Sequence, residues 1–77
     1  MNKERRKRIS KYLEELEFIQ SEVQSIKDEE QDAYDNLPES IQLSDRGCQI
    51  EAYADALDEA YYNLQEAIDT LFDIAEG

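Results

Sequence analysis

Residues 9–38 read ISKYLEELEFIQSEVQSIKDEEQDAYDNLP, and the spacing of their apolar side chains sets the type of fold. Apolar residues recur every seven positions in two columns, the a and d positions of a heptad repeat. The a column is Ile9, Leu16, Val23, Glu30 and Leu37, with Glu30 as its only polar member. The d column is Tyr12, Ile19, Ile26 and Ala33, and Leu13 and Tyr34 widen the stripe on the e side. The pattern predicts one long helix packed along a single seam.

The second half of the chain repeats this rhythm with three adjacent apolar columns. Its a column is Ile50, Leu57, Leu64 and Leu71. Its d column is Tyr53, Ala60, Ala67 and Ile74, and its e column is Ala54, Tyr61, Ile68 and Ala75. Ser44 is a suitable N-cap, because its hydroxyl can accept a hydrogen bond from a backbone N–H of the first turn.

Between the two patterns, Pro38 ends the first helix, because its ring disfavours helical geometry at the preceding residue. We therefore predict an all-α, single-domain protein over residues 1–77: a helix at about 3–36, a connector at 37–43 and a helix at about 45–75. The connector is predicted to contain one helical turn that starts at Pro38. So short a connection makes the two helices antiparallel neighbours in a coiled-coil-like hairpin.

Two helices alone bury one strip each, which is a small core for 77 residues without a metal or an internal disulfide. The extra apolar column predicts self-association, most simply as a two-fold dimer that forms a four-helix bundle. The predicted oligomer seam is Leu57, Tyr61, Leu64, Ile68 and Leu71. The competing prediction is a monomer that completes its core only on a different partner.

The composition excludes several classes of enzyme. The chain has no His, one Cys, two Gly and one Pro. It therefore lacks an imidazole base, a Ser–His–Asp triad, a cysteine zinc cluster and a phosphate-binding glycine loop. No apolar run approaches the length of a membrane span, and no apolar signal-peptide core follows the basic start. We expect a cytoplasmic, non-enzymatic protein without cofactor or metal that acts by binding.

Charge is strongly segregated along the chain. Twenty acids and eight bases give a formal charge of −12, so the acidic body is not expected to bind DNA or a membrane directly. Residues 1–11 contain six of the bases and one acid. Phosphate or partner contacts are possible there at Arg5, Arg6 and Arg8. The alternative is that this basic start pairs inside the fold with acids at the end of the second helix: Asp69, Asp73 and Glu76.

Two further groups of acids stand out. The first, the acidic pole, surrounds the connector and comprises Asp28, Glu29, Asp32, Asp35, Glu39 and Asp45. The second lies along the outward b, c and f columns of the second helix and includes Asp55, Asp58, Glu59 and Glu66. Solubility is one explanation for such a one-signed surface. The other is that the spaced carboxylates imitate nucleic-acid phosphates and occupy a basic groove on another protein, so these ten acids are the candidate partner-binding residues.

One stretch resembles a known family. Residues 28–40 read DEEQDAYDNLPES, and SDRG follows at residues 44–47. This is similar to short acidic proteins of unassigned function encoded in phages and prophages of Gram-positive bacteria, with the pattern D-E-E-x-x-A-[FY]-D-N-[LM]-P-E-S and then S-[DE]-R-G. The resemblance implies a phage accessory protein that acts in the bacterial cytoplasm against host machinery. Small acidic phage proteins often block nucleases, including CRISPR effectors, by occupying a nucleic-acid channel.

The leading expectation is therefore a dimeric, phage-type inhibitor or adaptor that binds a basic host protein, such as a nuclease or another nucleic-acid-binding protein. One alternative is a structural coiled-coil or assembly adaptor that works through its apolar stripe. Another is an oligomeric sponge for nucleotide signals, which would be bound by the basic ends and exposed tyrosines.

Overall fold

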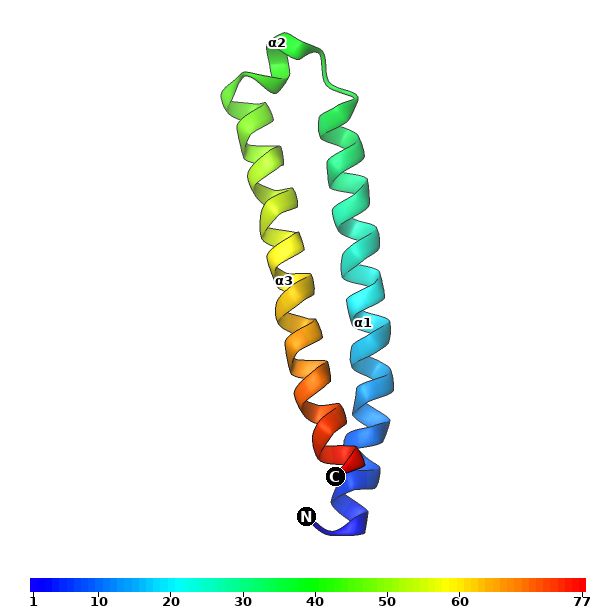
Figure 1. Cartoon of the computed structure of the whole chain (residues 1–77). Helices are drawn as coiled ribbons and strands as arrows, with labels where there is room; N and C mark the ends of the chain where they lie inside the picture. Colours follow the sequence, from blue (N-terminus) through cyan, green and yellow to red (C-terminus); the bar gives the residue numbers. More distant parts are fainter.

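The computed structural model describes all 77 residues as two long helices joined by a short connector. Helix α1 spans Lys3–Asp35, the single turn α2 spans Glu39–Gln42, and α3 spans Asp45–Glu76. Figure 1 shows α1 and α3 side by side in opposite directions, with α2 closing one end and both termini at the other. The rod measures 58 × 14 × 12 Å between Cα atoms. The predicted all-α helical hairpin is confirmed, and its helix boundaries lie within about a residue of the expected ones.

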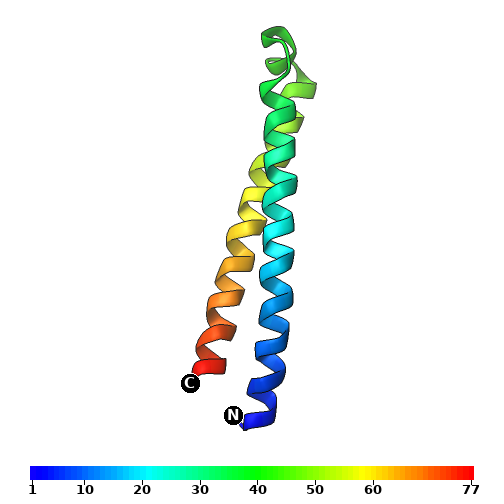
Figure 2. The same ribbon diagram turned by 90° about the vertical axis from the view of Figure 1, so that its right-hand side faces the viewer.

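Capping side chains account for the starts of both long helices. The Arg5 backbone N–H donates to Asn2 Oδ1 at 2.9 Å, so Asn2 caps α1, a role that the heptad pattern did not indicate. Ser44 caps α3 as predicted, with its hydroxyl oxygen accepting from the Gly47 N–H at 3.4 Å. Figure 2, turned by 90°, separates the helices at the end where Figure 1 overlaps them, so α1 and α3 cross at a small angle.

The connector folds over the end of the hairpin. Pro38 directly precedes α2, which confirms the predicted helical turn, and Gln42 Nε2 donates to the Tyr34 carbonyl oxygen at 3.0 Å. Gly47 is buried in the first turn of α3, where an added Cβ would overlap the carbonyl oxygens of Ile41 and Gln42. Glycine is therefore the one residue type that lets the connector lie this close to α3.

The seam uses different columns from those expected in the first helix. In α1 the a column and the e column (Arg6, Leu13, Gln20, Lys27, Tyr34) are buried or half-buried. The d column faces solvent instead, with Tyr12, Ile19 and Ile26 exposed by 50%, 48% and 49%. The e column also faces the inside in α3, where the e residues Gly47, Ala54 and Ile68 are buried. The prediction of an a/d seam is wrong by one column: the small, fully buried Ala54 lets α1 approach on the e side.

The hairpin buries little. Its buried apolar side chains are Leu13, Ala54 and Ile68. Its accessible surface is 5892 Å², whereas a compact monomer of 9.0 kDa exposes about 4,900 Å². The single hairpin thus leaves about 1,000 Å² more surface in water than chains of its size usually do.

The rod has two long faces of opposite character. Because the helices are antiparallel and meet through their a and e columns, both d columns flank the seam on one side and both b columns on the other. We call the first the apolar face: Tyr12, Ile19, Ile26, Ala33, Tyr53, Ala60, Ala67 and Ile74. We call the second the polar face: Glu17, Gln24, Gln31, Glu51, Asp58 and Gln65, with Phe72 as the exposed apolar residue at the end of the α3 b column.

Candidate functional site

Polar pairs cross the seam along the polar face at regular intervals. Lys27 pairs with Asp58 and Gln20 with Gln65, and Tyr34 lies beside Glu51. From one pair to the next, the α1 residue lies seven positions earlier and the α3 residue seven positions later. One side chain of each pair therefore comes from the α1 e column and the other from the α3 b column. The sequence signal for this row is the set of polar residues at successive e positions of α1, Gln20 and Lys27, beside the polar b positions Glu51, Asp58 and Gln65 of α3.

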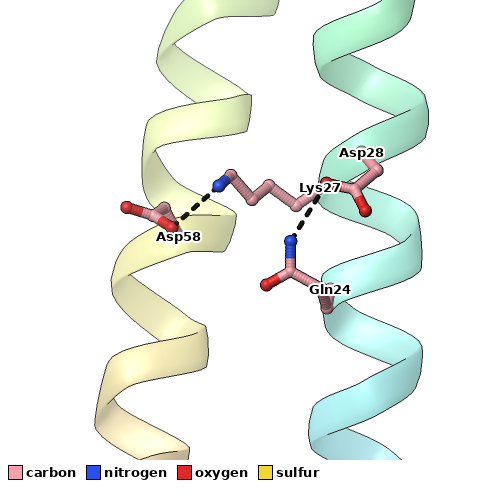
Figure 3. Close-up of polar contacts among 4 residues, drawn as sticks. All are labelled: Gln24, Lys27, Asp28 and Asp58. Atoms are coloured by element: carbon pink, nitrogen blue, oxygen red, sulfur yellow. Dashed lines mark hydrogen bonds and ion pairs between the residues drawn. The ribbon is translucent and has the colours of Figure 1, made fainter.

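The Lys27–Asp58 pair is the one ion pair of the hairpin. Lys27 Nζ lies 3.0 Å from Asp58 Oδ1, as Figure 3 shows, and the two side chains are 27% and 42% exposed. The hydrogen bond to Asp58 raises the pKa of Lys27 above its ordinary value of 10.5, against a smaller opposing effect of desolvation. Asp58, one of the ten candidate partner-binding residues, is therefore engaged within the fold.

Gln20 forms the most buried of the polar pairs. The side chain is 8% exposed and donates from Nε2 to Gln65 Oε1 at 2.8 Å and to the Tyr61 carbonyl oxygen at 3.3 Å. A buried amide without partners is costly, so these bonds favour the alignment of the helices that supplies them. At the next pair, the hydrogen bond to Glu51 and desolvation raise the pKa of Tyr34 above 10.0.

The other nine candidate acids are exposed and form no ion pair. They are Asp28, Glu29, Asp32, Asp35, Glu39, Asp45, Asp55, Glu59 and Glu66. Over the whole chain, 19 of the 20 acids lack a cationic partner, and Arg46 at the connector end pairs with none of them. Asp28 and Asp35 accept hydrogen bonds from Gln24 and Gln31, each one turn earlier in α1. Because these donors are neutral amides, they orient the carboxylates without cancelling the charge (Figure 3 shows the first).

The basic start does not pair with the end of the second helix. No ion pair joins Arg5, Arg6 or Arg8 to the acids of the last turns of α3, so the expected pairing within the fold is wrong. Both figures show the start of α1 extending past the end of α3, which takes the first basic residues out of reach. Arg5 and Arg8 are exposed, whereas Arg6 is half-buried with an Nε atom that has no hydrogen-bond partner.

The predicted oligomer seam lies on the side of α3 that faces α1. Ile68 is buried, and Leu57, Tyr61, Leu64 and Leu71 are half-buried within the single hairpin. The apolar side chains left free in long rows are instead those of the apolar face.

No three carboxylate or thiol side chains converge into a group that could hold a metal ion. Neither long helix has a segment apolar enough to cross a bilayer. No protein-family model, curated protein or solved structure matches the chain. The resemblance to acidic phage proteins therefore stays a prediction.

Proposed function

We propose that the protein is a non-enzymatic binding protein whose exposed carboxylates occupy a basic, nucleic-acid-binding surface of another protein. The observation that carries the proposal is that nine of the ten candidate acids, all but Asp58, are exposed and have no intramolecular cation. Such a surface is electrostatically complementary to a groove built to hold phosphates.

The spacing of the acids supports imitation of a nucleic-acid strand. Helix α3 carries nine acids in 32 residues, or about one per 5 Å at 1.5 Å rise per residue. A DNA strand carries one phosphate per 3.4 Å of axis. The stiff rod of 58 Å holds this row of charge without the entropy loss of ordering a flexible segment.

The acidic pole is unfavourable for the isolated hairpin, which also supports a binding role. The last turn of α1 contains Asp32 and Asp35 and no basic residue. Negative charge at a helix C-terminus opposes the macrodipole by about 0.3–1 kcal/mol per charge. Contact with a cationic surface would relieve this repulsion, so binding through the acidic pole is favoured.

The proposed setting follows from the resemblance to acidic phage proteins. The partner is then a basic host protein in the bacterial cytoplasm, a nuclease or another nucleic-acid-processing or defence protein, and the outcome is inhibition in the manner of an anti-CRISPR protein.

The test is capture of proteins from a Gram-positive bacterial lysate on the immobilised chain. We expect a basic nucleic-acid-binding protein to be retained at about 0.05 M salt, released at about 0.5 M salt as screening rises, and displaced by double-stranded DNA. Asp32→Lys with Asp35→Lys should abolish capture. The control is Glu14→Lys with Glu17→Lys, which changes the net charge by the same amount at the same spacing. These two residues lie outside the candidate partner-binding set, so the control variant should retain capture. Equal capture by both double variants would refute the proposal.

The exposed apolar face favours a second candidate, an assembly role in which the hairpin dimerises into a four-helix bundle or joins a larger coiled coil. In that case Ile19→Lys, at a residue 48% exposed on this face, removes function. Asp32→Lys with Asp35→Lys, at the acidic pole, then leaves function unchanged.

A third candidate, the nucleotide sponge, has one supporting feature. Arg5 and Arg8 share a shallow pocket with Met1, Ile9 and Tyr12, which places two guanidinium groups beside an exposed aromatic ring.

A further inference from the structure

We infer that a second copy of the chain covers the apolar face, lying antiparallel to the first so that the basic end of each rod meets the acidic connector end of the other. This inference deepens the proposed dimerisation by naming the face and the direction. It replaces the α3 residues that sequence alone suggested, because those pack against α1 within the hairpin.

The apolar face combines the conditions that a helix–helix interface needs. Five of the chain's large exposed apolar side chains lie on it, in two rows: Tyr12, Ile19, Ile26, Tyr53 and Ile74. Ala60 and Ala67 lie between the last two on α3. Small residues at these positions allow a second helix to approach closely.

The α3 half of this face carries no acid, and its one charged residue is Arg46 at the connector end of the d column. All acids of α3 lie on its b, c and f columns. The adjoining g column consists of the uncharged residues Gln49, Ala56, Asn63 and Thr70. A second molecule of charge −12 can therefore dock here without burying like charges.

The dimensions fit a stable dimer. A face of 58 by 14 Å has an area of about 800 Å², the amount that each partner contributes to an interface of standard size. It is also close to the excess of about 1,000 Å² that the hairpin exposes over a compact monomer.

The direction follows from the charges at the two ends of the rod. Residues 28–51, at the connector end, hold eight acids and one base, a net charge of −7. The other end, residues 1–11 with 69–77, holds six bases and four acids, a net charge of +2. A parallel dimer places the two connector ends, each of charge −7, side by side. An antiparallel dimer places each connector end beside an end of charge +2, which lowers the repulsion.

The d column of α1 suits this two-fold arrangement. Ile19 is the central residue of α1, so a two-fold axis across the middle of the rod brings it opposite its own copy. Tyr12 and Ile26, each seven residues away, then lie opposite one another. On the flanking g column, Arg8 comes near Glu29 of the second copy, and Glu15 comes near Glu22, two acids that are exposed at the edge of the face.

Two measurements test the inference. Sedimentation equilibrium should give a two-chain mass for the wild type and for Phe18→Lys, whose side chain is 66% exposed on the outward c column. Ile19→Lys, one residue along, should weaken self-association at least tenfold with helicity retained, because Ile19 is half-exposed in the single hairpin. A monomeric wild type, or equal effects of the two substitutions, would overturn the inference.

The direction is tested by spin-labelling the exposed native Cys48, near the connector end. An antiparallel dimer should place the two labels about 50 Å apart, since each lies about 18 helical rises from the centre. A distance near 20 Å, about two helix diameters, would instead establish a parallel dimer and refute our inference.

Failure here is separable from failure of the proposed function. If Ile19→Lys still captures a basic protein from lysate while the wild type proves monomeric, the acidic binding role stands and the dimer does not.

Discussion

Lys27 Nζ lies 3.0 Å from Asp58 Oδ1, so the single ion pair of this acidic rod joins its two helices on the polar face. The contact brings together residues 31 positions apart and belongs to the row of polar pairs that also includes Gln20–Gln65. This row gives the polar face a structural role and leaves the opposite face free for association.

Removal of the ion pair should have a small, salt-dependent effect. Both side chains are more than a quarter exposed, and ion pairs in such settings are strongly screened. We expect Lys27→Met to lower stability slightly at low salt and hardly at all at high salt. Urea denaturation of Lys27→Met, Asp58→Asn and the double variant measures the coupling, and a coupling that persists in high salt would contradict this account.

Stability should fall in alkaline solution. The pKa values of Lys27 and Tyr34 are both raised in the folded chain, by hydrogen bonds to Asp58 and Glu51 respectively. For a raised pKa the stabilisation is fully present below the unfolded values, 10.5 and 10.0, and is lost as pH rises through the folded ones. Thermal unfolding followed from pH 8 upwards should therefore show a loss that begins above about 10.

Glu51→Gln provides the matching control for Tyr34. The amide removes a negative charge beside the phenol, so the pKa of Tyr34 should move toward its ordinary value of 10.0. Ultraviolet absorbance of tyrosinate, with Tyr34→Phe to identify the signal, measures this shift. No change on substitution would show that Glu51 does not control the phenol.

Gly47→Ala should destabilise the hairpin, although alanine is the better helix former. The added Cβ would overlap the carbonyl oxygens of Ile41 and Gln42, so the connector must shift. Overpacking of this kind costs about 1–3 kcal/mol. Ser25→Ala, at an exposed site in α1, should be neutral or stabilising. Chemical denaturation compares the two, and increased stability of Gly47→Ala would refute the close approach.

The buried Gln20–Gln65 pair should show non-additive behaviour. Gln65→Leu leaves the Gln20 amide without its side-chain acceptor and should cost about 1–3 kcal/mol. Adding Gln20→Leu removes the unpaired amide and should restore much of the loss. Denaturation of the two single variants and the double variant tests this, and simple additivity would argue against a coupled pair.

The nucleotide-sponge alternative has a direct test at the basic end. Arg5→Glu with Arg8→Glu should abolish any increase in melting temperature that nucleotides produce, because both guanidinium groups line the same shallow pocket. Glu4, on the same turn, supplies a control as Glu4→Gln, which should leave the shift intact. A melting temperature that does not respond to nucleotides in the wild type excludes this function.

The amino-acid sequence determined the helices and their ends by itself. Heptad spacing is a local signal, Pro38 excludes helical geometry just before it, and Ser44 supplies an acceptor for the first turn of α3, so none of these features depends on the rest of the fold. The exposure of the acidic pole was also readable, because so many like charges cannot share an interior.

Tertiary structure alone decided which columns meet. In α1 the d column is apolar whereas the e column contains Arg6, Gln20 and Lys27, so periodicity favours d, the column that faces solvent in the structure. The choice depends on residues distant in sequence: Ala54 is small enough to admit α1, and Asp58 and Gln65 satisfy Lys27 and Gln20 across the seam. Packing volume and polar satisfaction belong to pairs of helices, so they appear only when both helices are in place.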